Sequence, residues 1–237
     1  MNVLVTGASS GIGESIARAL VRADHKVIMM ARRKMLLATI ANELNAEHAG
    51  QALVATGDVA QVADCERAVQ LGLAAFGHID ALVNAAGTWS DKAFIDTDYE
   101  QLREFIDTDV TGAIQISRAV LPSLKHTKGR MIHINGLQGL VRQRQPVLYA
   151  AVEAAVRGLC ESLRWEVAHQ GIHIGLVTLG AVANTEAYKS DPAVLCRGKE
   201  RVSLSRYEVV EAVKFMLTRP NGVNVDELVL TPLGQQW

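Results

Sequence analysis

The chain has 237 residues, of which 49% are hydrophobic and 21% are charged, and its formal net charge is −1. This balance argues against a disordered chain, a basic nucleic-acid face or an acidic tail, so we expect no nucleic-acid partner. No apolar run reaches the roughly 18 residues of a membrane span, and the first one comes too early for a signal peptide. We therefore expect no membrane partner. The composition favours a soluble globular protein with a small-molecule ligand.

The cysteines and histidines give no sign of a disulfide framework or a metal site. The chain has an odd number of cysteines, three, which lie far apart and form no Cys-x-x-Cys pair: Cys65, Cys160 and Cys196. This pattern fits a reducing compartment, and we expect a cytoplasmic protein. His133 and His173 lie in predicted strands without metal-ligand spacing, so we expect core or near-surface side chains and no metal.

A glycine turn near the start of the chain is the first motif that carries chemistry. It lies between an apolar run and a stretch of helical periodicity, and it reads Thr6-Gly7-Ala8-Ser9-Ser10-Gly11-Ile12-Gly13. Glycine tolerates positive φ and has no side chain, so Gly7 suits a tight turn and Gly11 lets an anion reach the main chain. Gly13 lets the helix pack closely, and the first helical N–H groups form an anion site with the hydroxyls of Ser9 and Ser10. The motif predicts dinucleotide binding; the alternative is a Gly/Ser-rich loop before a helix.

Short β-branched runs alternate with longer helical stretches along the whole chain. We predict strands at about residues 2–6, 26–30, 51–55, 79–83, 130–135, 172–178 and 225–230. We predict helices at about residues 11–23, 34–48, 62–76, 99–121, 146–169 and 207–217. The expected fold is α/β: a single NAD(P)-binding domain over residues 1–237, built as a Rossmann-like three-layer α/β/α sandwich with a seven-stranded parallel sheet.

The least regular segment runs over about residues 180–205. Irregular segments longer than about 12 residues are usually functional in compact domains. This one follows the carboxyl end of a predicted strand, where parallel sheets bind ligands, so it is a candidate substrate lid; the alternative is a mobile surface loop. Its basic residues favour an anionic or polar substrate, unless they are simply solvated: Lys189, Arg197, Lys199 and Arg201.

Several motifs together resemble the short-chain dehydrogenase/reductase family over essentially the full chain. The glycine turn matches the family's Thr-Gly-x-x-x-Gly-x-Gly, and Asp58-Val59 matches the pair that contacts adenine. Asn84-Ala85-Ala86-Gly87 resembles the family's Asn-Asn-Ala-Gly element. Leu179-Gly180-Ala181-Val182 resembles the Pro-Gly-x-Val turn near the nicotinamide, with Leu179 in place of proline. Tyr149 lies early in a long helix, as the family's catalytic tyrosine does. The stretch 224–230 resembles the last strand of a branch that includes NADP-dependent hydroxy-acid dehydrogenases.

The end of the second predicted strand indicates which dinucleotide binds. In a Rossmann unit an acidic residue there bonds the ribose 2′-hydroxyl of NAD and repels the 2′-phosphate of NADP. This chain has Arg32 and Arg33 instead, and guanidinium groups pair well with phosphate. The sequence thus favours NADP(H) over NAD(H), unless the arginines only begin a solvated helix. The expected cofactor-binding residues are Gly7, Ser9, Ser10, Gly11, Ile12, Gly13, Arg32, Arg33, Asp58, Val59, Asn84, Ala85, Ala86, Gly87, Tyr149, Glu153, Gly180 and Val182.

Three of the four side chains that the resemblance assigns to hydride chemistry are replaced. Tyr149 keeps the acid/base position, but Glu153 stands where the family has Lys, Gly136 where it has Ser, and Asp109 where it has Asn. Glu153 follows Tyr149 by four residues on one helical face, so its charge disfavours phenolate. Tyr149 should then stay a neutral phenol that can still give a proton to a carbonyl. Groups nearby that could replace the missing ones are Asn135, Gln138, Arg142 and Arg144.

Three functions remain open. The first is an NADP(H)-dependent oxidoreductase, similar to short-chain dehydrogenases, that acts on a small carbonyl or alcohol substrate through an altered active site. The second is a catalytically impaired NADP(H)-binding protein with a regulatory or partner role. The third is a non-redox lyase or epimerase with Glu153 or Asp109 as a general base. Small residues around Tyr149, together with the resemblance, predict a homodimer or homotetramer.

Overall fold

A seven-stranded parallel sheet forms the centre of the computed structural model, which describes residues 1–90, 92–140, 146–183, 196–197, 200–201 and 203–233. The strand order is β3-β2-β1-β4-β5-β6-β9, and all neighbouring pairs run parallel. The strands are β1 (Asn2–Thr6), β2 (Lys26–Ala31), β3 (Ala52–Thr56), β4 (Ala81–Asn84), β5 (Arg130–Gly136), β6 (His173–Leu179) and β9 (Glu227–Leu230). The predicted sheet is therefore confirmed.

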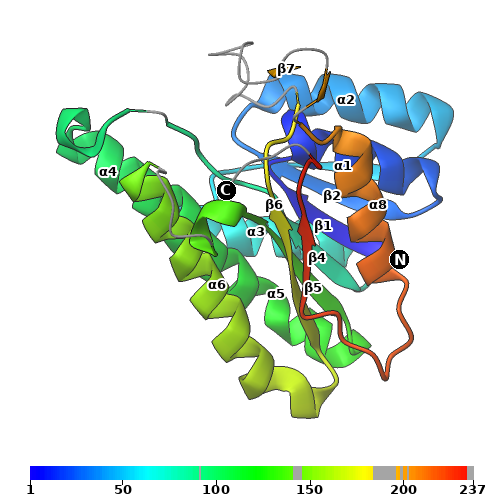
Figure 1. Ribbon diagram of the computed structural model, residues 1–237. Coiled ribbons are helices and arrows are strands. Elements are labelled where there is room, and N and C mark those ends of the chain that lie inside the picture. Colours follow the sequence, from blue (N-terminus) through cyan, green and yellow to red (C-terminus); the bar gives the residue numbers. More distant parts are fainter. Residues whose placement is uncertain (91, 141–145, 184–195, 198–199, 202, 234–237) are drawn as a thin grey trace.

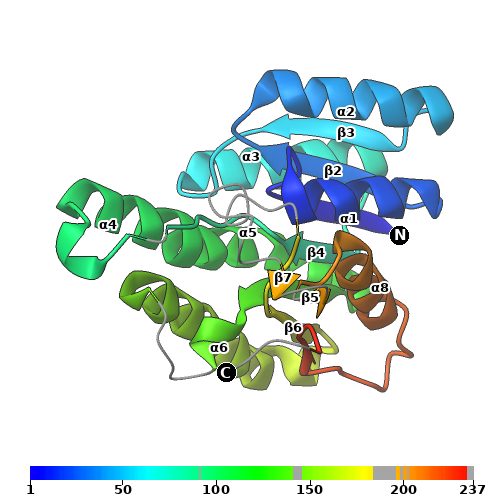
Figure 2. The ribbon, with the colours of Figure 1, turned by 45° about the horizontal axis from the view of Figure 1, so that its top comes forward.

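Helices cover both faces of this sheet (Figures 1 and 2). The helices are α1 (Gly11–Arg22), α2 (Lys34–Glu47), α3 (Val62–Phe76), α4 (Tyr99–Phe105), α5 (Gly112–Thr127), α6 (Val147–Val167) and α8 (Arg206–Leu217). One buried cluster joins α1, α2 and α8 to the sheet, and a second cluster joins α3, α5 and α6 to the opposite face. The predicted three-layer α/β/α architecture is thus confirmed. Among the described residues, no helix is both long and apolar enough to cross a membrane.

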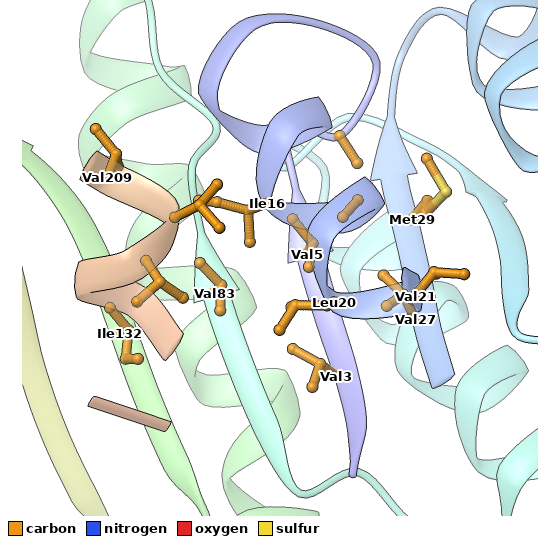
Figure 3. Close-up of a cluster of buried hydrophobic side chains, with 14 of the residues drawn as sticks. Val3, Val5, Ile16, Leu20, Val21, Val27, Met29, Val83, Ile132 and Val209 are labelled. Carbon is orange, nitrogen blue, oxygen red and sulfur yellow. The ribbon is translucent and has the colours of Figure 1, made fainter. Parts of the chain in front are cut away.

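The alternation of side chains in β1 shows how one strand serves both clusters. Val3 and Val5 pack with Ile16 and Leu20 of α1 (Figure 3), whereas Leu4 belongs to the cluster on the other face. All five side chains are at most 1% exposed. A strand that is buried on both faces reads as a continuous apolar run, which explains the sequence Val3-Leu4-Val5.

The position of β1 in the sheet creates a crevice for a ligand. Consecutive strands run outward from β1 through β2 to β3, and then the chain returns to place β4 on the other side of β1. At such a reversal of strand order, neighbouring connections leave the sheet on opposite faces and open a gap at the carboxyl ends of the strands. The glycine turn follows β1 directly, so it lies at this point.

The prediction of one continuous α-helix over residues 99–121 is wrong. The structure has α4, then a π-helical segment (Ile106–Thr111), then α5, which ends at residue 127. The segment contains no proline or glycine that would mark a break in the helix, so the sequence pattern did not reveal it. Such segments are frequent at functional sites, and this one contains Asp109.

Most of the candidate lid lies outside the described residues, including Lys189 and Lys199. The described part contains a short hairpin that the sequence did not predict, β7 (Cys196–Arg197) paired with β8 (Glu200–Arg201). Val182 forms a bridge with Leu204, which ties the two ends of the segment together.

A matched pair of helix glycines tests the packing of α5. A Cβ at Gly112 would lie 2.6 Å from Val59 Cγ2, whereas a Cβ at Gly158 would meet nothing within 4 Å. We expect Gly112→Ala to lower the free energy of unfolding by roughly 1–3 kcal/mol through overpacking. Gly158→Ala should raise it by about 0.5–1 kcal/mol through helix propensity. Denaturant unfolding of both variants measures the difference, and equal effects would contradict the described contact.

Candidate active site

One cleft of about 1170 Å³ runs along the carboxyl ends of the strands. Every residue predicted to bind the cofactor lines it, and so do Asp109 and Gly136. Residues from the first strand to the turn after β6 therefore meet in one place. Trp89 lines the cleft as well, and the lining residues that could not be selected from the sequence include Thr88 and Arg206.

The glycine turn has the backbone that its sequence predicts. Gly7 and Gly11 have φ values of +65° and +58°, a region that L side chains rarely adopt. A Cβ at Gly7 would lie 2.5 Å from the Ala85 carbonyl oxygen, so Gly7 also permits close approach of the loop after β4. A Cβ at Gly13 would lie 2.5 Å from the Gly7 carbonyl oxygen, so Gly13 packs against the turn itself.

The amino terminus of α1 is available to an anion. The side chain of Ser10, its N-cap residue, makes no capping hydrogen bond. The N–H groups of the first turn therefore keep their hydrogen-bonding capacity and the positive end of the helix dipole. The Arg206 guanidinium also lies here, because its Nη1 donates to the Gly11 carbonyl oxygen at 3.1 Å. Arg206 comes from α8, so only the tertiary structure reveals it.

Arg33 reaches from the end of β2 to the glycine turn. Its Nε donates a hydrogen bond to Ser9 Oγ at 3.1 Å, and its Nη2 donates to Ser10 Oγ. Arg32 Nη1 lies 3.7 Å from Glu104 Oε1 and 3.9 Å from Asp58 Oδ2. Arg33 therefore does not merely begin a solvated helix: it places a guanidinium group over the turn.

Glu153 is a buried carboxylate beside Tyr149. Its Oε2 accepts a hydrogen bond of 2.6 Å from the Gly136 N–H, and its carboxylate accepts a second from the Tyr149 hydroxyl. Burial raises the pKa of Glu153, although these two hydrogen bonds oppose the rise. Burial, the Glu153 carboxylate and Asp109 together hold the pKa of Tyr149 well above 10. Tyr149 is therefore a neutral phenol at neutral pH.

Gly136 leaves room for the tyrosine. A Cβ at this position would lie 2.6 Å from Gln138 Oε1 and 2.9 Å from the Tyr149 hydroxyl oxygen. Tyr149 and Gln138 thus occupy the space that a larger residue would need. The Trp89 ring packs edge-on against Tyr149, with ring centroids 4.7 Å apart. Asn135 Nδ2 donates to the Glu153 carbonyl oxygen at 3.3 Å. Arg142 and Arg144 lie outside the described residues.

Asp109 is a second buried carboxylate, with 8% of its surface exposed. Its Oδ1 accepts a hydrogen bond from the Thr88 N–H at 3.0 Å, and its Oδ2 accepts one from the Thr88 hydroxyl at 2.5 Å. Burial raises the pKa of Asp109 to about 7, and repulsion from Glu153 and Glu104 adds to the rise. The hydrogen bonds from Thr88 act in the opposite direction and lower this pKa. Asp109 is therefore about half ionised at neutral pH.

A buried network joins the glycine turn to the loop after β4. Thr6 Oγ1 donates to Asn84 Oδ1 at 2.5 Å and accepts hydrogen bonds from the N–H groups of Ala85 and Ala86, each at 3.1 Å. Asn84 Nδ2 lies 3.2 Å from His133 Nδ1. Burial lowers the pKa of His133 to about 4, so the ring is neutral and accepts from Asn84.

The other nitrogen of His133 completes this network. Ser117 donates its hydroxyl to the Ala113 carbonyl oxygen at 2.6 Å, so His133 Nε2, at 3.2 Å, is the donor to Ser117 Oγ. The expectation of a core histidine is thus confirmed for His133. No group of three or more His, Cys, Asp or Glu residues within the described ranges could hold a metal ion.

Comparisons with known proteins agree with this architecture. The family model described as short chain dehydrogenase matches residues 1–193. An uncharacterized oxidoreductase from Staphylococcus epidermidis is 31% identical over 231 residues, which cover 97% of this chain and 96% of the relative. The alcohol dehydrogenase of the archaeon Thermococcus sibiricus, solved with 5-hydroxy-NADP, has a TM-score of 0.89 and 30% identity, over 99% of this chain and 97% of that one. A serine dehydrogenase solved in a closed form with NADP+ has a TM-score of 0.89 and 29% identity, over 100% of this chain and 97% of that one.

Replacement of Asp109 tests the burial of its charge. Folding raises the pKa of this carboxyl from about 3.9 in the unfolded chain to about 7. Ionisation of Asp109 therefore opposes folding. The free-energy cost grows as the pH rises from about 3.9 to about 7 and is constant above that pH. We expect Asp109→Asn to raise the free energy of unfolding by on the order of 1–3 kcal/mol at about pH 8, with no gain near pH 4. Denaturant unfolding at both pH values measures this. Asp107→Asn is the matched control, and a gain that is equal at both pH values would contradict the assignment.

Proposed function

The chain belongs to the short-chain dehydrogenase family, and we propose that it is an NADP(H)-dependent oxidoreductase that reduces a small carbonyl substrate with Tyr149 as the acid. One observation carries this proposal. A single cleft holds both the Arg33 guanidinium, bonded to Ser9 and Ser10 at the glycine turn, and the Tyr149 hydroxyl. The first group suits the phosphates of the cofactor, and the second suits the oxygen of a carbonyl substrate.

The residues of the cleft fit NADP(H). A Cβ at Gly11 would meet nothing within 4 Å, so the turn leaves open space beside the free N–H groups of α1 for a pyrophosphate. Arg33, with Ser9 and Ser10, is placed for the 2′-phosphate, and no carboxylate directly follows β2 to repel it. The structures of two similar proteins, the Thermococcus sibiricus alcohol dehydrogenase and the serine dehydrogenase, contain NADP-type cofactors.

The protein groups around Tyr149 favour reduction. When bound, NADPH supplies a hydride for the carbonyl carbon. Tyr149 is protonated at neutral pH because its pKa lies well above 10, so its hydroxyl can donate a proton to the carbonyl oxygen. Glu153, which accepts a hydrogen bond from the Tyr149 hydroxyl, can orient this hydroxyl in the cleft. Trp89 packs against the Tyr149 ring and limits its rotation.

We extend the proposal to a homo-oligomer that pairs through α6. This helix exposes a row of small residues, and a row without long side chains lets a second helix approach closely: Ala151, Ala154, Ala155 and Gly158. The exposed Trp165 on the same helix would add apolar area to such a contact.

A second candidate function is cofactor binding without catalysis. The specific observation in its favour is that the Tyr149 hydroxyl already donates to Glu153, while Gly136 offers no hydroxyl to orient a substrate. In this case the protein would bind NADP(H) as a regulator or partner subunit. The lyase or epimerase alternative would use the same raised pKa values of Asp109 and Glu153 for a general base.

The role of Arg33 is tested by cofactor affinity. We expect Arg33→Ala to weaken NADPH binding by roughly ten- to a hundredfold, because the 2′-phosphate loses a charge-assisted contact. NADH lacks this phosphate, so its affinity should change little. Calorimetry with both cofactors measures the two effects, and Arg22→Ala, at the far end of α1, is the control. An equal loss for NADPH and NADH would contradict the role assigned to Arg33.

The role of Tyr149 is tested by turnover. Wild-type protein is mixed with NADPH and a panel of small aldehydes, ketones and keto acids, and the loss of NADPH absorbance is followed. Tyr149→Phe should lower kcat by roughly 10²-fold or more, because the proton donor is lost, while NADPH affinity changes little.

The same experiment separates the candidate functions. Tight NADPH binding by the wild-type protein without turnover of any substrate supports the second candidate. Turnover of a substrate without oxidation of NADPH supports the lyase or epimerase. Full activity in Tyr149→Phe would contradict the proposed acid.

A further inference from the structure

The cationic side chains of the cleft gather at one end. Arg32, Arg33 and Arg206 lie at the end formed by β2 and the glycine turn, and they are the only lysine or arginine residues among the described lining residues. Asp109 and Glu153 line the other end, beside Tyr149. The cleft therefore carries carboxyl groups without a cationic partner at its Tyr149 end.

The arrangement of the sheet assigns the two ends to different parts of a dinucleotide. This step rests on the proposed function, that is, on NADP(H) as the ligand. In a doubly wound sheet each half binds one mononucleotide, on either side of the strand-order reversal. Arg33 follows β2 and marks the half for the adenosine 2′-phosphate. The nicotinamide then falls on the half that contains β4, β5 and β6, where Asp109 and Glu153 lie.

We propose that the carboxylates of Asp109 and Glu153 make this cleft bind the oxidised cofactor, NADP+, more tightly than NADPH. The nicotinamide ring of NADP+ carries a positive charge, whereas the dihydronicotinamide ring of NADPH is neutral. The two forms share every other group. A negative charge fixed at the ring end therefore attracts only the oxidised form.

Neither carboxylate is neutralised within the described structure. The partners of Asp109 are the N–H and hydroxyl groups of Thr88, and those of Glu153 are the Gly136 N–H and the Tyr149 hydroxyl. All four partners are neutral donors, so no cationic group offsets the charge of either carboxylate when it is ionised. Both carboxylates are at most 8% exposed, so water screens their charges little.

An unpaired buried amide oxygen supports a ligand at the same end. Asn135 is 3% exposed and lines the cleft, and its Oδ1 has no hydrogen-bond partner although its Nδ2 is bonded to the Glu153 carbonyl. A buried polar atom without a partner is costly, and a ligand can supply the hydrogen bond that it lacks. This oxygen adds a further negative dipole to an end that already carries two carboxyl groups.

The preference should depend on pH. The pKa of Asp109 is about 7, so its ionised fraction increases as the pH rises through neutrality. Among the elements around it, α4 contributes the carboxylate of Glu104, and α6 contributes Tyr149 and Glu153. The loop over 85–90 contributes no ionisable side chain. A cationic ring stabilises the ionised carboxyl, so NADP+ gains affinity with rising pH while NADPH does not.

The preference has a consequence for either candidate function. A tenfold tighter binding of NADP+ lowers the reduction potential of the bound couple by about 30 mV, which makes bound NADPH a stronger reductant. In a reductase this favours hydride transfer to the substrate and makes NADP+ a strong product inhibitor. In a protein without catalysis, the same preference would make the fraction of cofactor-bound protein follow the concentration of NADP+.

Binding measurements test the proposal without any turnover. Dissociation constants for NADP+ and NADPH are measured by calorimetry at about pH 6 and pH 8, on either side of the Asp109 pKa. We expect the ratio of the NADPH constant to the NADP+ constant to be roughly tenfold or more at about pH 8, and smaller at about pH 6. The ratio cancels the titration of the 2′-phosphate and any partial loss of folded protein, because both affect the two forms equally.

Variants assign the effect to the carboxylates. Glu153→Gln and Asp109→Asn keep the side-chain shape and remove the charge, and each should move the ratio toward one. If one variant does not fold, the other still provides the test. Glu161→Gln, two turns further along α6, half-exposed and paired with Arg157, should leave the ratio unchanged.

Each result has a distinct meaning. A ratio of one or less in wild-type protein at both pH values overturns this inference but leaves NADP(H) binding intact. A ratio above one that neither carboxylate variant changes overturns the role of Asp109 and Glu153. Failure of both cofactor forms to bind overturns the proposed function together with this inference.

Discussion

The hydrogen bond from the Gly136 N–H to Glu153 Oε2, 2.6 Å long, joins the carboxyl end of β5 to the second turn of α6. Most of the chemistry of the cleft depends on this contact. It fixes a buried carboxylate within reach of the Tyr149 hydroxyl, which lies one helical turn earlier. It also explains why residues 136 and 153 are unusual together: Gly136 supplies a backbone donor, and its missing side chain leaves space for Tyr149 and Gln138.

The remaining walls of the cleft are linked by similar buried contacts. Asp109 holds the loop after β4 through Thr88, and Thr6 holds the same loop through Asn84 and the Ala85 and Ala86 N–H groups. A displacement of this loop would therefore disturb both the glycine turn and the π-helical segment that carries Asp109. Both ends of the cleft, cationic and anionic, are thus built on one connected framework.

The sheet, its order of elements and the glycine turn could be predicted from the sequence, because they rest on local patterns. Apolar runs such as Val3-Leu4-Val5 mark buried strands, and positive φ at Gly7 and Gly11 follows from the spacing of the turn. Contacts between distant segments could not be predicted in this way. Arg206 reaches the turn from α8, Thr88 pairs with Asp109, and no proline or glycine marks the π-helical segment.

The charge of Glu153 and its position four residues after Tyr149 were visible in the sequence, but its partner was not. Only the fold shows that the Gly136 N–H satisfies this carboxylate. The most direct test of the account is a crystal structure of the protein with NADP+. We predict that the 2′-phosphate lies within hydrogen-bonding distance of the Arg33 guanidinium. The nicotinamide ring should lie at the Tyr149 end, beside the carboxylates of Asp109 and Glu153. A cofactor bound in the reverse direction, or a ring held away from both carboxylates, would contradict it.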